Sequence, residues 1–308
     1  MAANIPNRLY KYRSFSDLSL RMIVSDELYF ADPSTFNDPL DSKPCLEVNV
    51  NEMELRGLLN TLVQQRVLAE MSSAANSLNY RGPKTKQHIE RYSQKAGHGA
   101  VDNVLCLAGG LIDEHENVSE ILLAVEIERE LLQRYEAGIF SLAERPNCPL
   151  MWSHYGEQHK GLCIGYSIPE CSNVSVRKVE YDRERTVRAS DVLAMLNGDQ
   201  LAKEQVDGGV LLHKAPSWSY EGEWRLTGNR GVQRSPLELE EITFGLRCAM
   251  AVKFAVCNAL KNRARSVSFY EIVESRPTFE LTRREVNVEE LASVYPLRSL
   301  DSQREFVE

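Results

Sequence analysis

The apolar positions of the chain follow a helical period in its first part and a strand period after Gly138. Short apolar runs bounded by turn residues are typical of strands, because a strand is brief and ends where Gly, Pro, Asn or Asp breaks it. Such runs lie at 9–13, 28–30, 139–142, 162–166, 175–181, 218–226 and 240–244, and further strands are expected around Phe269 and Phe279.

Apolar residues spaced by three or four positions predict five helices. They cover residues 18–24, 51–72, 118–135, 190–212 and 247–263, and Ser16 with Asp17 would cap the first. The polar residues 73–100 predict a loop and a weaker helix. In the segment 118–135 the expected inward stripe is Ile121, Leu122, Val125 and Leu132, whereas Ile127 and Leu131 fall off it.

This mixture of strands and inserted helices lacks a regular strand–helix alternation, which predicts an α+β fold. We find no internal repeat and no linker that would separate a second domain. The sequence therefore predicts one α+β domain over residues 1–308, with a mostly helical insertion at about 51–135.

Composition and charge narrow the function classes. The 308 residues carry a net charge of −8, which argues against a broad nucleic-acid-binding surface. No apolar run approaches the ~18 residues of a membrane-spanning helix. Seven scattered cysteines form no C-x-x-C pair, and the first six residues lack the apolar core of a secretory signal. We therefore expect a cytoplasmic protein with reduced thiols.

The segment Trp218-Ser-Tyr-Glu-Gly-Glu-Trp-Arg-Leu226 is the sharpest candidate for chemistry. In a strand, alternate side chains share a face, so Glu221, Glu223 and Arg225 would point one way. A pair of carboxylates suits glycosyl transfer, because one can stabilise an oxocarbenium-like centre while the other binds a neighbouring hydroxyl. The alternative is a solvated outer face of an amphipathic strand.

A second candidate is Met151-Trp-Ser-His-Tyr-Gly-Glu-Gln-His-Lys-Gly161. Its aromatic side chains could stack on a flat ring, and Gly161 could let a ligand approach the backbone. His154 and His159 are five residues apart, which is a poor spacing for shared metal binding on one helix face. The alternative is structural packing of Trp152 and Tyr155.

A third candidate combines the first strand with the loop Phe36-Asn-Asp-Pro-Leu-Asp41. Arg13 offers a guanidinium fork for a phosphate or a carboxylate. Asn37, Asp38 and Asp41 could organise the loop through bonds to its backbone, and Asp38 before Pro39 is typical of a turn former.

These segments together resemble a bacterial family known as the domain of unknown function 2971. The matching pieces are 9–13, 28–30, 36–39, 139–142, 150–155, 159–161, 218–225 and 242–245. More loosely, residues 8–30 and Tyr220-Glu-Gly-Glu-Trp224 resemble the ADP-ribosyltransferase fold, which implies a split β-sheet core with the helical insertion and peripheral helices around it.

The resemblance to ADP-ribosyltransferases implies a role for each candidate. Glu223 would be the catalytic carboxylate, Glu221 would orient the acceptor, Tyr155 would stack on nicotinamide, and Arg13 would hold the pyrophosphate of NAD⁺. The catalytic candidates are Glu223, Glu221, Tyr155 and His154. The candidates for binding NAD⁺ are Tyr12, Arg13, Asn37, Asp38, Trp152, His159, Trp218 and Arg225, and no metal ligand is assigned.

The leading hypothesis is therefore an NAD-dependent mono-ADP-ribosyltransferase, acting as a toxin or in phage defence, on an acceptor that the sequence does not identify. One alternative is a Mg²⁺-dependent hydrolase or nuclease that uses Asp38, Asp41, Glu221, Glu223 and His154, since Mg²⁺ prefers carboxylate oxygens. Another is a non-catalytic binding or sensor module with the same fold. Substituting Glu223 by Gln is expected to lower NAD⁺ turnover ~100-fold and leave folding nearly unchanged.

Overall fold

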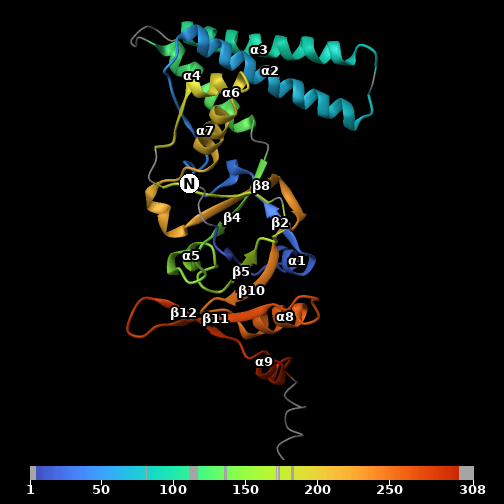
Figure 1. Cartoon of the computed structure of the whole chain (residues 1–308), viewed down its shortest axis with the longest axis vertical. Helices are drawn as coiled ribbons and strands as arrows, with labels where there is room; N and C mark the ends of the chain where they lie inside the picture. Colours follow the sequence, from blue (N-terminus) through green and yellow to red (C-terminus); the bar gives the residue numbers. More distant parts are fainter. Residues whose placement is uncertain are drawn as a thin grey trace, which may run out of the picture. The chain divides into compact units, whose positions relative to one another are not determined.

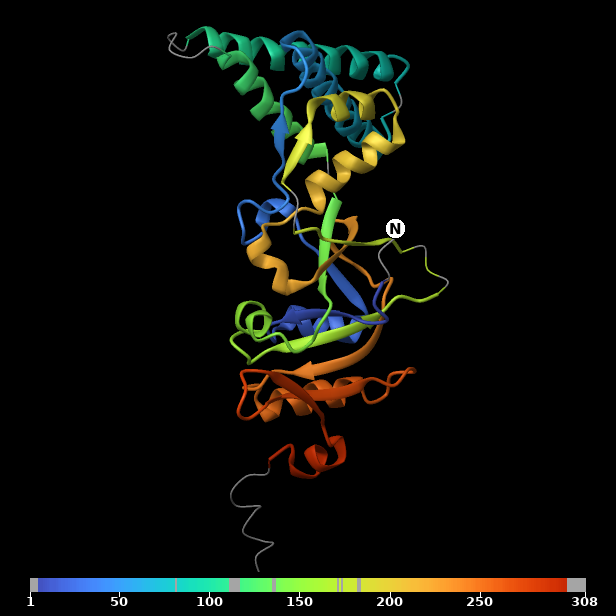
Figure 2. The same cartoon turned by 60° about the vertical axis from the view of Figure 1, so that its left-hand side comes forward.

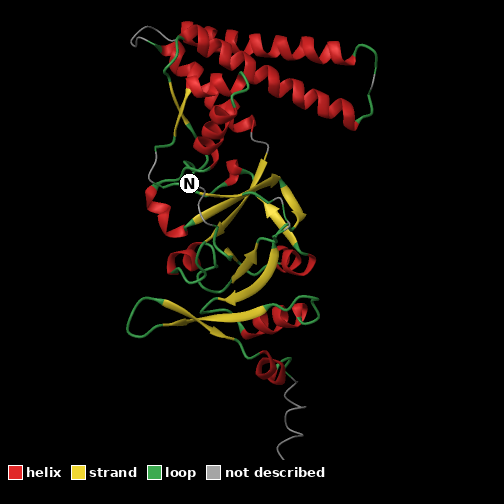
Figure 3. Cartoon of the chain, viewed as in Figure 1, coloured by secondary structure: helices red, strands yellow, loops and turns green. Residues whose placement is uncertain are grey.

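The computed structural model of the chain describes residues 5–80, 82–110, 117–134, 137–170, 172, 174–181 and 184–297. The chain forms two compact units, and its mixed helices and strands confirm the α+β class (Figure 3). Unit 1 comprises Met1–Ala31, Gly138–Val179 and Ser217–Glu308, and unit 2 comprises Asp32–Ala137 and Glu180–Pro216. The sequence predictions that involve Tyr135, Cys171 and the first four residues concern positions outside the described residues.

An eight-stranded mixed sheet forms the centre of unit 1, in the order β12-β11-β10-β5-β1-β4-β8-β6 (Figure 2). Strands β10 and β11 are parallel, and the other described pairs are antiparallel. The strands are β1 (Leu9–Arg13), β4 (Ala137–Ala143), β5 (Leu162–Ser167), β6 (Val176–Lys178), β8 (Glu223–Asn229), β10 (Glu238–Phe244), β11 (Ser268–Glu274) and β12 (Leu281–Glu285).

Strand β1 is joined unequally to its two neighbours. All five of its residues are in register with β5, from Leu9 opposite Tyr166 to Arg13 opposite Leu162. In the described register with β4, only Tyr10 has a partner, Ala143. The Lys11 ammonium donates a hydrogen bond of 2.8 Å to the Ser141 carbonyl of β4. The sheet is thus continuous on one side of β1 and only narrowly joined on the other.

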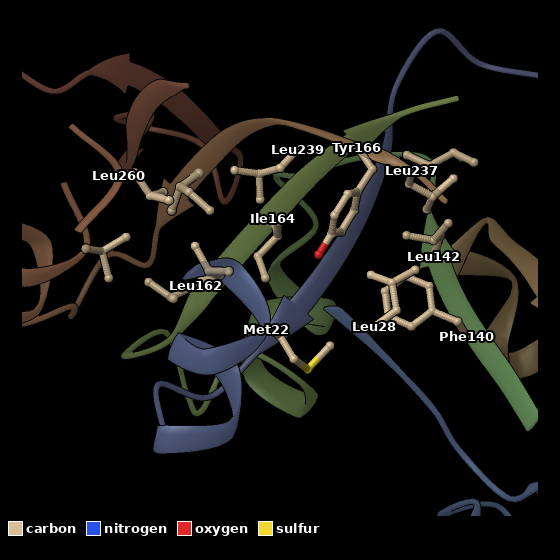
Figure 4. Close-up of a cluster of buried hydrophobic side chains, with 14 of the residues drawn as sticks. Met22, Leu28, Phe140, Leu142, Leu162, Ile164, Tyr166, Leu237, Leu239 and Leu260 are labelled. Carbon is tan, nitrogen blue, oxygen red and sulfur yellow. The ribbon is translucent and has the colours of Figure 1, made fainter. Parts of the chain in front are cut away.

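The two faces of this sheet carry different residues because side chains alternate along each strand. Leu9, Trp224 and Leu226 belong to a large apolar cluster that includes Met22 of α1 (Asp17–Ser25) and Val256 of α8 (Met250–Leu260). Figure 4 shows Met22 together with other members of this cluster. We call this side the apolar face. Tyr10, Tyr12, Ala143, Met151 and Trp152 belong to a second cluster on the opposite side, which we call the aromatic face.

Several smaller elements complete unit 1. Ser16 caps α1 through its hydroxyl, which accepts from Ser19 N, as the sequence predicts. Strands β2 (Glu27–Phe30) and β9 (Gly231–Arg234) form a separate antiparallel pair. The remaining elements are α5 (Pro149–His154), the 3₁₀ helix η2 (Pro216–Glu221) and α9 (Val288–Val294).

Unit 2 is mostly helical (Figure 1). Its helices are α2 (Glu52–Ser77), α3 (Thr85–Gly110), α4 (Val118–Arg134), α6 (Ala189–Leu196) and α7 (Gln200–Leu211), with η1 (Pro33–Thr35) and the parallel pair β3 (Cys45–Glu47) and β7 (Thr186–Arg188). None of the helices in the described residues is long and apolar enough to cross a membrane.

Helix α4 turns a different face inward from the one the sequence predicts. Ile121 and Val125, two members of the expected stripe, are 58% and 51% exposed. Ile127 and Leu131, which fall off that stripe, are completely buried. The helix carries two apolar stripes, and only tertiary packing selects the buried one.

Other boundaries differ from expectation at residues that break regular structure. Residues 73–100 contain the end of α2 and much of α3 rather than a weak helix. The helix expected at 190–212 is divided into α6 and α7 at Gly198, whose φ of +93° ends the first. Phe279 lies in the loop between β11 and β12 and is fully exposed, so the strand expected there begins two residues later.

Candidate functional site

Trp152 of α5 packs into the protein rather than lining a ligand platform. Its side chain is completely buried, and its indole N–H donates 2.9 Å to the Pro146 carbonyl. Tyr12 meets the indole edge-on at 5.1 Å, and His159 stacks on it at 6.2 Å. The environment of Trp152 therefore fits structural packing, the alternative considered from sequence, better than it fits binding of NAD⁺.

The loop after α5 is fixed by close backbone contacts. Glu157, Gln158 and His159 have positive φ values of 52°, 54° and 71°. A Cβ atom at Gly161 would overlap the carbonyl oxygen of Arg13, so the close approach expected at this glycine is taken by β1 and not by a ligand. His159 O accepts from Arg247 N at 2.8 Å. Burial, followed by the charge of Arg247, lowers the pKa of His159.

Four rings gather where the two sequence motifs meet. The His154 ring lies 6.2–6.3 Å from the rings of Tyr155, Trp218 and Tyr220, and the last two lie 5.9 Å apart. We call these four residues the aromatic cluster. The His154 side chain is exposed, and the other three are half-buried. His154 and Tyr220 are nearly parallel, at an interplanar angle of 28°. The cluster therefore offers ring surface that a planar ligand can reach.

Glu221 lies at the end of η2 next to this cluster. The Tyr155 hydroxyl donates a hydrogen bond of 2.9 Å to Glu221 Oε1. Glu221 is only 5% exposed, so its carboxylate is held in a largely desolvated position. This contact joins two motifs that are 66 residues apart in the chain.

Glu223 has a different environment, although it is only two residues away. Arg225 donates from Nε to Oε1 at 2.8 Å and from a terminal nitrogen to Oε2 at 3.1 Å. The two side chains are 4% and 0% exposed. The result is a buried, bidentate ion pair that involves both carboxylate oxygens of Glu223.

The prediction that Glu221 and Glu223 share one face of a strand is wrong. Residues 216–221 form η2, and β8 begins only at Glu223. Gly222 between them has φ of +50°, which takes the chain out of extended geometry. For the same reason Tyr220 packs in the cluster of the aromatic face, whereas Trp224 packs in that of the apolar face.

Tyr12 and Arg13, alternatives for the same role, point to opposite faces of β1. The Tyr12 hydroxyl donates 2.7 Å to the Arg145 carbonyl and accepts from Cys148 N at 3.3 Å. Arg13 follows the alternation of Leu9 and lies on the apolar face. The structure therefore places Tyr12 with Trp152 but does not bring Arg13 to the same side.

The remaining candidates, Asn37 and Asp38, belong to unit 2. Asp38 Oδ1 accepts from Leu40 N at 2.9 Å, which is the turn-forming role favoured for it. Asp41 is buried and lies 3.4 Å from the Lys214 ammonium, a partner that no sequence pattern indicated. In the parts of the chain that are described, no group of three or more His, Cys, Asp or Glu could hold a metal ion.

The sequence analysis did not consider Glu144 and Lys178, which contact Trp224 of β8 or one another, and it gave Tyr220 no role. The Trp224 indole donates 3.0 Å to Glu144 Oε1, and the same oxygen lies 2.7 Å from the Lys178 ammonium. Tyr220 belongs to the aromatic cluster, whereas the sequence argument used it only as part of the segment 220–224 and gave it no role of its own. The number of aromatic residues close to Glu221 in the sequence was the pattern that could have indicated a role for Tyr220.

Comparison with known proteins identifies a family for one segment of the chain but indicates no activity. Residues 151–226 match the model of a family described as "Protein of unknown function (DUF2971)", which confirms the predicted family for this segment. No curated protein and no solved structure matches the chain. The matched segment begins and ends with the two motifs that the Tyr155–Glu221 hydrogen bond brings together.

Proposed function

We propose that the protein is an NAD⁺-dependent mono-ADP-ribosyltransferase whose reacting carboxylate is Glu221. The observation that carries the proposal is the 2.9 Å hydrogen bond from the Tyr155 hydroxyl to this buried carboxylate, beside four aromatic rings. NAD⁺ would be the substrate that donates ADP-ribose, and the acceptor is a separate molecule.

The chemistry needs a negative charge and a flat surface. When the bond between nicotinamide and ribose breaks, positive charge develops on the ribose ring, and a fixed carboxylate stabilises it. A carboxylate that is only 5% exposed acts through a lower dielectric than one in water, so its charge is felt more strongly. The rings of Tyr155 and Trp218 would stack on the nicotinamide, and His154 would close the exposed side.

We assign this role to Glu221 rather than to Glu223, the residue favoured by the family resemblance, because Glu221 accepts from Tyr155 beside the aromatic cluster. Glu223 lies at the start of β8, where both of its oxygens accept from Arg225. We assign Glu223 and Arg225 to positioning: they fix the start of β8 and thereby the turn at Gly222 that carries Glu221.

The sheet supports the same proposal. In the described register, β1 and β4 pair only at Tyr10 and Ala143, which accords with the split sheet implied by the resemblance to ADP-ribosyltransferases. The Mg²⁺-dependent alternative has no such support, since no cluster of potential ligands occurs in the described residues.

The test is release of nicotinamide from labelled NAD⁺ by the full chain, with and without EDTA. We expect release that EDTA leaves unchanged. Tyr155→Phe should lower the rate about tenfold, because Glu221 loses a hydrogen bond to its charged oxygen. Tyr80→Phe, at an exposed position of unit 2, is the matched control and should keep the full rate. Absence of release, or chelator-sensitive cleavage of a phosphodiester, would contradict the proposal.

A further inference from the structure

Helix α3 of unit 2 carries a row of basic side chains on its exposed side. The row consists of five exposed residues that follow one another every three or four positions: Lys84, directly before the helix, and His88, Arg91, Lys95 and His98. The His88 amide donates 2.9 Å to the Lys84 carbonyl, so Lys84 belongs to the first helical turn. Residues with this spacing lie on one side of a helix, and we call the row the basic stripe.

The opposite side of α3 packs closely against α2, which fixes the direction of the stripe (Figure 1). A Cβ atom at Gly97 would overlap both the side chain and the carbonyl oxygen of Asn60 in α2, so the two helices approach closely there. At about 100° per residue, the buried positions of α3 lie about half a turn away from the stripe. These buried residues are Ile89, Ser93, Gly97 and Val104.

The three cations of the stripe are not neutralised by the described part of the chain. Lys84, Arg91 and Lys95 form no ion pair with a described carboxylate, whereas Lys86, which lies off the stripe, is 3.9 Å from Glu90. The segment from the first of these cations to the end of the stripe has four Lys or Arg residues and one Glu, in a chain whose net charge is −8. The overall charge argues against a broad nucleic-acid-binding surface but not against this local concentration of positive charge.

We infer that the basic stripe binds the phosphate backbone of a single-stranded nucleic acid. A regular row of cations matches a polymer that carries a negative charge on every unit. The row from Lys84 to Lys95 extends about 16 Å, because a helix rises about 1.5 Å per residue. Tyr92 beside the stripe is 55% exposed, and its ring lies 6.5 Å from the His88 ring at an interplanar angle of 27°. Its open ring surface is available to stack on an unpaired base.

A membrane surface fits the same residues less well. A helix that lies in the interface of a bilayer needs bulky apolar side chains next to its basic ones. Between Lys84 and His98 the one large aliphatic residue is Ile89, which is 8% exposed and packs inward. The polar residues Gln87 and Gln94 flank the stripe instead.

The test measures the binding of a fluorescent oligothymidylate of about 20 nucleotides to the full chain by anisotropy, at several salt concentrations. Three phosphate contacts predict that the logarithm of the association constant falls against the logarithm of the salt concentration with a slope of about −2. Replacing Lys84, Arg91 and Lys95 together by Gln should lower the affinity about tenfold or more at low salt and bring the slope close to zero. All three side chains are exposed, so the melting temperature should be unchanged.

The matched control replaces three other exposed cations of unit 2, Arg129, Arg188 and Lys203, by Gln. This variant changes the net charge by the same amount but leaves α3 intact, so it should keep the wild-type affinity and slope. Tyr92→Ala should weaken binding about fivefold and leave the slope unchanged, because it removes a stacking surface and no charge.

Salt-dependent binding that the stripe variant loses and the control variant keeps would support the proposal. The proposal fails if the oligonucleotide does not bind, or if both triple variants weaken binding equally. It also fails if vesicles of phosphatidylserine or polyglutamate bind the wild-type chain more tightly than the oligonucleotide does, since the stripe would then belong to a membrane or to an acidic protein. NAD⁺ is absent throughout, so the result is independent of the proposed transferase activity.

Discussion

Arg225 and Arg13 lie on opposite faces of the same sheet and show two ways of handling a sheltered positive charge. On the aromatic-face side of β8, Arg225 is completely buried and matched by both oxygens of Glu223. On the apolar-face side of β1, Arg13 has no partner in the described residues. The pair of Glu223 and Arg225 is expected to contribute to stability, whereas Arg13 gains no stabilisation from a described carboxylate.

The largest expected effect comes from breaking the matched pair. Glu223→Gln removes the carboxylate charge that accepts two hydrogen bonds from the buried Arg225, so the free energy of unfolding should fall by about 3 kcal/mol or more. This replaces the expectation, drawn from sequence, that the change leaves folding nearly untouched. Urea denaturation measures it.

The matched control is Glu274→Gln, which removes the partner of Arg276 in a pair whose side chains are 57% and 88% exposed. That change should cost less than about 1 kcal/mol, since water screens the pair. Equal effects of the two substitutions would show that the Glu223–Arg225 pair is not buried as described.

A smaller effect is expected where the loop after α5 meets the end of β1. Gly161→Ala places a Cβ atom against the Arg13 carbonyl, and relieving the overlap should cost about 2 kcal/mol of stability. Gly57→Ala in α2 meets nothing within 4 Å and should instead stabilise by up to about 1 kcal/mol. Thermal unfolding of the two variants should move in opposite directions, and parallel shifts would contradict the packing of this loop.

The smallest effect concerns the pH dependence of His159. Because its pKa is lowered in the folded state, the unfolded chain binds the proton more readily. The resulting stability is present above the ordinary pKa of about 6.5 and is lost as the pH falls through the lower folded value. Between pH 7.5 and pH 5.5 the wild-type chain should therefore lose more stability than His159→Gln.

His98→Gln provides the comparison for that measurement, because His98 is an exposed residue of α3. It should reproduce the wild-type dependence on pH. A wild-type curve that runs parallel to the His159→Gln curve would mean that this imidazole is not sheltered by Trp152.

Sequence patterns located the strands beside the site well, and local physics explains why. Residues 9–13 and 162–166 are short apolar runs between breakers, and β1 and β5 occupy them almost residue for residue. The Ser16 cap followed from side-chain chemistry that needs no tertiary partner.

The sequence predictions were wrong where the conformation of a residue depends on contacts with residues far away in the chain. Nothing local distinguishes the exposed Ile121 from the buried Ile127, because the choice depends on what packs against α4. The strand expected over 218–226 assumed that Gly222 continues the extended chain, but its φ of +50° ends η2 and turns Glu221 away from Glu223. The Tyr155–Glu221 bond and the absence of an Arg13 partner likewise depend on residues far apart in sequence.

The most direct test of the account separates the two neighbouring carboxylates by activity per folded molecule. Nicotinamide release from NAD⁺ should be measured for Glu221→Gln and Glu223→Gln at a temperature where denaturation curves show both to be folded. We expect Glu221→Gln to fall about 100-fold with little change in stability, because it loses the charge at the reacting centre. Glu223→Gln should lose mainly stability and retain most of its rate per folded molecule. A wild-type rate in Glu221→Gln, with the loss confined to Glu223→Gln, would contradict the assignment.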